Sequence, residues 1–404
     1  MKHHGHYNVI SLKVVLNSVA RTAADIRRAI ESNWKEYLSR YGNLFSSNFI
    51  DGSSPPSVFV GSYGYPKILV GPMLPPIHGD TTILDSPEKW TGKSLEDIIN
   101  YRLSLVRGIK QIPVKKPHGQ YIENLQELAM SSRATDAEME FTKNTTPVVS
   151  IDGHSPIFGP IGEIKSAKFA SSSSDKKIQK RFYDKDLLAQ DAVVELYNRG
   201  IDVTRIQKCF SIGMFGKDRK LVPTRWSITA TDDIISKSLI EKILDYDLID
   251  TSLVFQYNHL GNFFAVIIFP SRWMFEMQEA WYDERGDVGF GSDFEDARGL
   301  DHYPETAGAH FASRLAVTEY LEKRKTQAAA MVLREIRPEY AVPVGVWQVR
   351  EGVRMALKEK PVVVPNFQEG LDLACKGLSI DKKEWLARSK LQRARNQKSI
   401  SEFF

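Results

Sequence analysis

Apolar residues recur at helical spacing near both ends of the chain. Between residues 15 and 40, Val15, Val19, Ile26, Ile30 and Trp34 lie four or seven positions apart, with basic residues between them. This spacing predicts a helix. The same pattern predicts further helices over Ser94–Val106, Leu187–Tyr197, Ala307–Lys323, Gln327–Glu335 and Val349–Lys358.

Short apolar runs bounded by glycine and proline predict strands in the middle of the chain. Two runs, Val58–Val60 and Lys67–Val70, lie in a Pro/Gly-rich stretch. Two more, Val254–Tyr257 and Phe263–Phe269, have the pattern of a hairpin. Residues 143–180 carry prolines and then serines, and are expected to form an exposed loop or a subdomain boundary.

These elements together predict an α+β protein. We expect a mixed sheet core with helices at both ends and a flexible basic C-terminal tail. The predicted parts are an N-terminal helical segment, an α+β domain, a mainly helical domain and the tail, over residues 1–44, 45–290, 291–375 and 376–404.

Composition narrows the class of protein. The 404 residues are 42% hydrophobic and 10% aromatic, which excludes a mostly disordered chain. The 54 basic and 50 acidic residues leave a formal charge of +4, so contact with nucleic acid has to come from a local basic patch. Two cysteines, Cys209 and Cys375, are too few for a four-cysteine zinc site, and we expect no metal.

Targeting signals are missing from the sequence pattern. No apolar run reaches the roughly 18 residues that a transmembrane helix needs. The N-terminus lacks the pattern of a secretory signal, and we interpret the nearby His3, His4 and His6 as part of a terminal tail. The sequence therefore predicts a cytoplasmic protein without membrane contact, and it identifies no cofactor.

The last eight residues match the pattern by which proteins bind DNA sliding clamps. The pattern is a glutamine, two free positions, an aliphatic residue, two free positions and two aromatics, here Gln397, Ile400, Phe403 and Phe404. In one tight helical turn, residues three and four apart share a face, so the three apolar side chains can enter one pocket. The alternative is that both phenylalanines pack onto the protein's own body.

A basic run precedes this motif. We expect it to contact DNA phosphates or to steer the tail to an acidic clamp surface. The alternative is the solvated face of a helix. The run comprises Lys382, Lys383, Arg388, Lys390, Arg393 and Arg395.

Several motifs are similar to those of a known family. They are SSPPSVFVG-YGYP (Ser53–Pro66), GP-LPP (Gly71–Pro76), LVPTRWSITATDD (Leu221–Asp233), WMFEMQEAW (Trp273–Trp281) and REIRPEYAVPVGVWQVRE (Arg334–Glu351). With the C-terminal motif, they resemble the archaeal Nre family of DNA repair proteins, which bind the sliding clamp PCNA. The resemblance covers about Phe45 to Phe404.

This resemblance implies a role in the response to DNA damage, with PCNA and DNA as partners at the nucleoid. It supplies no catalytic mechanism. Some members carry an N-terminal cysteine-rich element, but this chain has no cysteine before Cys209, so no zinc is carried over.

Two interior clusters are candidate catalytic sites. If Arg225–Thr229 is a strand, Arg225 and Ser227 share a face that suits a phosphate or carboxylate. Asp232 and Asp233 then either cap a following helix or contact a metal or a sugar hydroxyl.

Glu276 and Glu279 form the second cluster. On a helix, these two glutamates share one side among Trp273, Phe275 and Trp281, which would suit acid–base chemistry. The alternative is that the aromatic residues are core and that the glutamates pair with nearby arginines.

A third group contains arginines beside an aromatic residue. Arg350 and Arg354 lie four apart, as do Trp347 and Glu351. They form either a helix that contacts the DNA backbone, with Trp347 stacked on a base, or a buried Arg–Glu network.

Two functional hypotheses result. In the first, the chain is a DNA-binding repair factor recruited by the clamp. In the second, it is a nuclease, glycosylase or transferase with a pocket around Arg225, Glu276 and Glu279. If Tyr63 and these three residues line one concave pocket, the enzyme hypothesis is favoured; if they form separate salt bridges, the first hypothesis is favoured.

Overall fold

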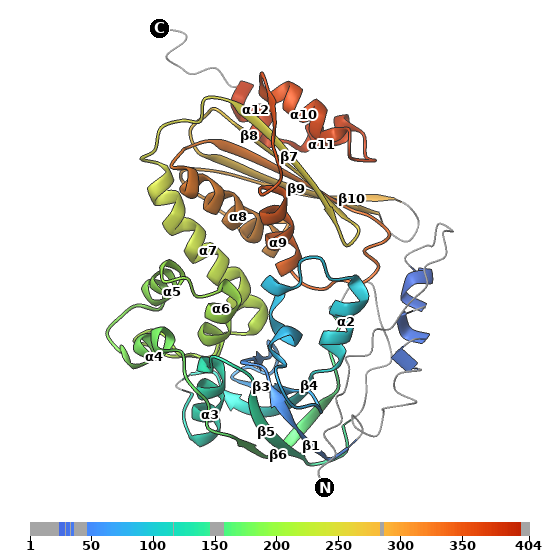
Figure 1. Cartoon of the computed structure of the whole chain (residues 1–404). Coiled ribbons are helices and arrows are strands. Elements are labelled where there is room, and N and C mark those ends of the chain that lie inside the picture. The colour runs from blue at the N-terminus through green and yellow to red at the C-terminus, as the bar shows by residue number, and fades with distance from the viewer. Residues whose placement is uncertain are drawn as a thin grey trace. The chain divides into compact units, whose positions relative to one another are not determined.

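The computed structural model (Figure 1) describes residues 24–28, 30–32, 34–35, 47–115, 117–145, 157–282 and 287–396. The chain divides into two compact units. Unit 1 comprises Met1–Thr231 and Ala341–Val344, and unit 2 comprises Asp232–Tyr340 and Gly345–Phe404. Each unit contains a mixed six-stranded sheet with helices, which confirms the predicted α+β class.

The sheet of unit 1 has the strand order β1-β5-β6-β4-β3-β2. Neighbouring strands are antiparallel except β4 and β6, which are parallel. Buried and exposed or half-buried side chains alternate along β5, as expected for a sheet with one covered face. The strands are β1 (Phe49–Ser54), β2 (Val58–Val60), β3 (Lys67–Leu74), β4 (Val106–Pro113), β5 (Thr135–Phe141) and β6 (Ile161–Phe169).

The helices of unit 1 confirm the predictions at Ser94 and Leu187. α2 starts after Ser94, whose hydroxyl accepts a hydrogen bond from the backbone N–H of Asp97 in a capping box. Residues described between 24 and 35 are helical too, and Ile30 and Trp34 pack with Ile99 and Leu103. The helices are α2 (Leu95–Leu103), α3 (Gln120–Met130), α4 (Lys176–Tyr183), α5 (Ala189–Asn198) and α6 (Val203–Ser211).

The segment 143–180, predicted to be a loop, contains regular structure. β6 and the start of α4 both lie in it. Most side chains of β6 are exposed or half-buried, and Ile164 is its fully buried residue. A strand with so little buried apolar surface gives a weak sequence signal.

The sheet of unit 2 has the order β10-β9-β11-β8-β7-β12. β11 lies near its centre, antiparallel to β8 and parallel to β9. The helix predicted over Gln327–Glu335 is therefore wrong: a strand covered on both faces reads as a continuous apolar run, which periodicity cannot distinguish from a buried helix. The strands are β7 (Ser252–His259), β8 (Asn262–Phe269), β9 (Met274–Tyr282), β10 (Val288–Asp296), β11 (Ala329–Ile336) and β12 (Val362–Val364).

Helices cover both faces of this sheet (Figure 1). One face packs against α8 (Gly308–Arg324) and α9 (Trp347–Ala356), the other against α10 (Phe367–Cys375) and α12 (Lys390–Asn396). Along β8, Ala265, Ile267 and Phe269 contribute to the core on the α10 side. Phe264 points the other way, toward Gly352 of α9, where an added Cβ would approach its ring to 2.3 Å.

The predicted hairpin is formed by β7 and β8. Its two-residue turn is Leu260-Gly261, and both residues have positive φ, 53° and 71°. This geometry matches the twist of the flanking strands.

The predicted basic tail is folded as far as residue 396. α11 (Lys382–Arg388) and α12 pack on the sheet of unit 2, with Trp385 and Leu391 in the hydrophobic core. The clamp motif at 397–404 lies outside the described residues. In the part of the chain that the structure covers, no helix combines the length and apolar character required to cross a membrane.

Candidate functional site

The first predicted catalytic cluster lies on a helix, not on a strand. α7 spans Thr224–Ile243 and begins after Pro223, whose carbonyl oxygen accepts hydrogen bonds from the backbone N–H groups of Trp226 and Ser227. At about 100° per residue, Arg225 and Ser227 lie on nearly opposite sides of a helix. Arg225 is exposed, whereas Ser227 is buried and accepts a 3.1 Å hydrogen bond from Gln207. The two side chains do not form a joint anion site.

The two aspartates of this cluster lie in the interior of α7, so they do not cap its start. The boundary between the units falls just before Asp232, and both carboxylates belong to unit 2. Each one pairs with a buried arginine: Asp233 with Arg314 of α8, and Asp232 with Arg350 of α9.

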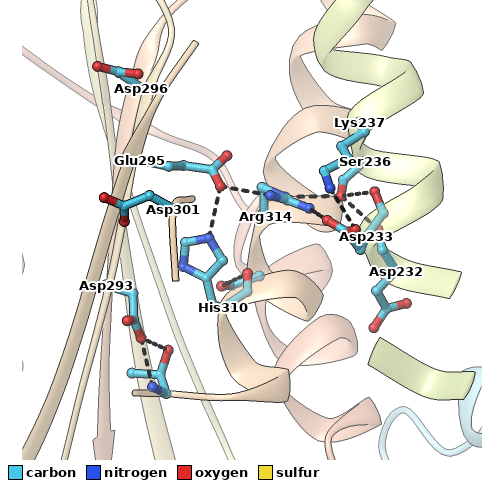
Figure 2. A network of polar contacts seen from close by, with 12 residues as sticks. Asp232, Asp233, Ser236, Lys237, Asp293, Glu295, Asp296, Asp301, His310 and Arg314 are labelled. Carbon is cyan, nitrogen blue, oxygen red and sulfur yellow. Dashed lines mark hydrogen bonds and ion pairs between the residues drawn. The ribbon is translucent and has the colours of Figure 1, made fainter. Parts of the chain in front are cut away.

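Arg314 is the centre of a buried polar network (Figure 2). Its guanidinium group donates to Asp233, to the Ser236 hydroxyl at 3.0 Å and to Glu295 of β10 at 2.7 Å. The His310 Nε2 atom lies 3.2 Å from the same Glu295 oxygen. The network therefore joins α7, α8 and β10.

Burial and charge oppose each other at Glu295. Burial raises the pKa of its carboxyl group, but the hydrogen bond to His310 and the charge of Arg314 outweigh burial and hold the pKa below its ordinary value. Among the described residues, the other Glu295 oxygen and the His310 Nδ1 atom find no hydrogen-bond partner. Because both side chains are fully buried, the network braces the fold and offers no accessible acid–base pair.

The third predicted group forms the buried network that was one of its two interpretations. Arg350 donates to Asp232 at 2.7 Å, and Arg354 binds Glu319 of α8 and Glu351. Burial raises the pKa of Asp232 despite the nearby arginine charges. Trp347 is buried too, so this group does not present a base-stacking surface.

Glu276 and Glu279 lie on strand β9, not on a helix, and their odd separation directs them to opposite faces of the sheet. Glu276 faces α12, where it accepts hydrogen bonds from the Ser389 hydroxyl at 2.6 Å and from the Lys390 backbone N–H at 2.7 Å. Glu279 faces α9 and pairs at 2.8 Å with Arg334, which also donates to Gln348. The predicted carboxylate pair is not formed.

The C-terminal basic run is only partly available to solvent. Lys382 pairs with Asp372, and the Arg388 guanidinium lies 3.9 Å from the centre of the Phe290 ring while it pairs with Glu384. Four of the six side chains are exposed: those of Lys383, Lys390, Arg393 and Arg395.

The structure exposes a cluster of three aromatic side chains in unit 1. Tyr63 is 84% exposed, Tyr65 50% and Trp226 50%, and the rings of Tyr65 and Trp226 stack with centres 6.0 Å apart. A strand at Arg225–Thr229 would have directed Trp226 away from Arg225, into the core. The helix instead places it beside the loop that carries the tyrosines. We name Tyr63, Tyr65 and Trp226 the aromatic patch.

Within the described ranges, we find no metal-binding cluster, and the buried thiol of Cys209 is poorly suited to catalysis. No group of three or more His, Cys, Asp or Glu side chains there is arranged to hold a metal ion. Cys209 is buried, and burial raises the pKa of its thiol to about 12, which makes it a poor nucleophile at neutral pH.

Comparison with known proteins identifies relatives over most of the chain. A "DNA repair protein NreB" from Archaeoglobus fulgidus is 38% identical over 358 residues, 87% of this chain and 91% of its own length. A "DNA repair protein NreA" from the same organism is 38% identical over 361 residues, which are 87% of this chain and 89% of that relative. A "DNA repair protein NreA" from Haloferax volcanii is 31% identical over 373 residues, which are 87% of this chain and 88% of that relative. No solved structure matches.

Two family models match in sequence order. The model described as "Archaeal Nre, N-terminal" matches residues 27–285, and "Archaeal Nre, C-terminal" matches residues 295–403. These matches confirm the resemblance found in the motifs, and the chain belongs to the archaeal Nre family.

Proposed function

We propose that this chain is a DNA repair protein that is recruited to DNA by the sliding clamp PCNA. The names of three relatives support the repair role. The clamp as partner is supported by the spacing of Gln397, Ile400, Phe403 and Phe404 in the sequence. A repair factor of this kind works in the cytoplasm at the nucleoid.

The observation that carries the proposal is that the clamp pattern directly follows a helix held in the core. Leu391 of α12 is buried, and the carboxylate of Glu276 accepts a hydrogen bond from the N–H group of Lys390, its first residue. Gln397 is the residue after the end of α12. The body therefore anchors the chain immediately before the docking pattern.

DNA contact is assigned to the exposed part of the basic run. Lys383, Lys390, Arg393 and Arg395 carry four positive charges within 13 residues of the chain. In a chain of nearly balanced charge, such a cluster provides the local basic patch that contact with DNA requires. Beside a clamp, these side chains would be available to the phosphates of the duplex that threads it.

Calorimetry of the full chain with an archaeal sliding clamp tests the proposal. Changing Phe403 and Phe404 to Ala removes both aromatic groups from the apolar pocket. We expect binding to fall by at least about 100-fold, because large aromatic anchors each contribute about 2 kcal/mol or more.

The matched control changes Ser399 and Ser401 to Ala, at positions that the pattern leaves free. This variant should bind as the wild type does. Equal affinity of the double Phe variant and the wild type would rule out the assigned docking motif.

The enzyme alternative gains no support from unit 2. Glu276 and Glu279 lie on opposite faces of β9, and each is bound to its own partners. Since these two carboxylates do not converge, the pair proposed for acid–base chemistry lacks its geometric basis.

A further inference from the structure

The aromatic patch lies on a loop that is held in place by backbone hydrogen bonds. Gly61 donates to the carbonyl oxygen of Leu69 at 2.7 Å, and Lys67 donates to that of Gly64 at 3.0 Å. Gly64 has a φ of +94°, which favours glycine, and an added Cβ would lie 2.8 Å from the Lys67 carbonyl oxygen. The loop thus holds Tyr63 and Tyr65 outward on a fixed backbone.

The same loop is joined to the helix that carries the third ring. The backbone N–H of Val60 donates to the Thr224 hydroxyl at 3.0 Å, at the first residue of α7. The Tyr65 and Trp226 planes meet at 28°, a stacked arrangement. Scattered exposed aromatic residues are ordinary, but here two rings stack and the same loop carries a third two residues away, which is the kind of exposed apolar surface that marks binding sites.

Basic residues lie on the segments that adjoin this surface. Val114 donates to the carbonyl oxygen of Pro66 at 3.0 Å, and Leu221 donates to that of Val114 at 2.9 Å, so the next residues along lie beside the loop. Lys115 and Lys220 pair there as an isolated β-bridge. Four exposed basic residues therefore belong to the segments that form the patch: Lys67, Lys115, Lys220 and Arg225.

The segments themselves carry no opposing charge. Residues 58–74, 106–115 and 220–226 contain six lysines and arginines and neither Asp nor Glu. A surface with aromatic faces and positive charge suits a ligand with flat rings joined by phosphates. In duplex DNA the base faces are stacked inside the helix, so single-stranded DNA fits this surface better than a duplex does.

We propose that the aromatic patch is a binding surface for single-stranded DNA. Tyr63, Tyr65 and Trp226 stack on unpaired bases, and Lys67 and Arg225 contact the adjoining phosphates. The choice of DNA over RNA rests on the proposed repair function, whereas the surface itself belongs to unit 1 and is separate in the sequence from the clamp motif.

Fluorescence anisotropy of a labelled oligothymidylate with the full chain tests this proposal. Changing Tyr65 and Trp226 to Ala should weaken binding by about tenfold or more, since both base–aromatic stacks are lost. Trp226→Phe keeps an aromatic face and should retain most of the affinity. Tyr183→Ala removes a tyrosine of unit 1 that is 66% exposed, on α4, and should leave the affinity unchanged.

Tryptophan fluorescence gives a second measurement. Of the seven tryptophans, Trp226 is 50% exposed and Trp281 38%, and the other five are buried. The oligothymidylate should therefore quench the emission of the wild type, and Trp226→Phe should abolish most of that quenching.

Three outcomes would overturn the proposal: equal affinity of the Tyr65/Trp226 variant and the wild type, tighter binding of the matching duplex, or tighter binding of oligouridylate. Clamp binding of the same variant separates the two proposals. Loss of oligothymidylate binding with normal clamp binding supports the patch. If oligothymidylate binding is retained while only Phe403 and Phe404 affect the clamp, the patch is refuted and the proposed function stands.

Discussion

At the residue scale, Arg314 shows how one buried cation holds three elements together. Its guanidinium group satisfies acceptors on α7 and β10 from its place on α8, and it is 1% exposed. Burying such a charge is costly unless every donor has an acceptor. Removing the cation leaves Glu295 buried with its charge uncompensated.

We expect Arg314→Met to destabilise the protein by about 3–5 kcal/mol, the usual cost of breaking a buried ion pair. Urea unfolding followed by fluorescence measures this loss. Lys237→Met is the matched control, because Lys237 pairs with the same Asp233 through a side chain that is 62% exposed. An exposed pair contributes about 0–1 kcal/mol. Equal losses for the two variants would contradict the role assigned to Arg314.

The sequence singled out several of these residues but not their task. Four carboxylates stand out because they occur beside apolar residues: Asp232, Asp233, Glu276 and Glu279. Carboxylates are rarely buried without a partner, so this pattern correctly indicates that each has a specific role. Their partners come from Arg314, Arg334 and Arg350, between 55 and 118 positions away, and from the start of α12. Local spacing cannot distinguish a buried ion pair from a catalytic pair, because both need charged groups in apolar surroundings.

At the element scale, β9 and α12 are joined through Glu276. The carboxylate accepts the N–H of Lys390 at the helix start, where free backbone donors favour a negative charge. Burial nevertheless raises the pKa of Glu276 above its ordinary value, against the hydrogen bonds from Ser389 and Lys390. The folded protein therefore holds this proton more tightly than the unfolded chain does.

A raised pKa in the folded state means that this group lowers stability as the pH rises from the ordinary glutamate value, about 4.3, through the higher folded value. Glu276→Gln cannot lose a proton, so its stability should fall less than that of the wild type over this range. Unfolding free energies of both proteins between about pH 4 and about pH 8 test this. Parallel curves would show that Glu276 does not titrate differently on folding.

Some strands could be predicted from the glycine and proline residues that bound them, among them β8, which is covered on both faces. β2, β3 and the β7–β8 hairpin were predicted because glycine and proline bound short apolar runs. β9 and β11 are covered on both faces, so their apolar residues show no period of two. α7 begins as a polar, β-branched segment, and its helical state depends on tertiary packing that spacing does not report.

At the scale of the whole molecule, the family motifs fall in both units. Ser53–Pro66 belongs to unit 1, whereas Trp273–Trp281 belongs to unit 2. The division into units falls inside α7, where the sequence has neither a linker composition nor a glycine or proline. A boundary within a continuous helix leaves no signal in composition.

With an overall charge of +4, the proposed duplex binding has to come from a few exposed side chains. Replacing Lys383 and Lys390 with Gln should weaken duplex binding and reduce the slope of log K against log salt concentration by up to about 2, since each phosphate that is no longer neutralised lowers the slope by about 0.9. Titrations at several salt concentrations measure this slope. Lys382→Gln is the control, because Lys382 already pairs with Asp372. An unchanged slope in the double variant would refute phosphate binding by these lysines.

The anchoring of α12 also limits the length of the linker between the folded body and the docking residues. From Arg395, the last described side chain, to Ile400 there are five residues, which span at most about 18 Å when fully extended. A clamp-bound molecule would thus be held close to the surface of the clamp. Other proteins that bind the same clamp subunit would then be excluded by steric overlap as well as by occupation of its pocket. Only one of them could use a given subunit at a time.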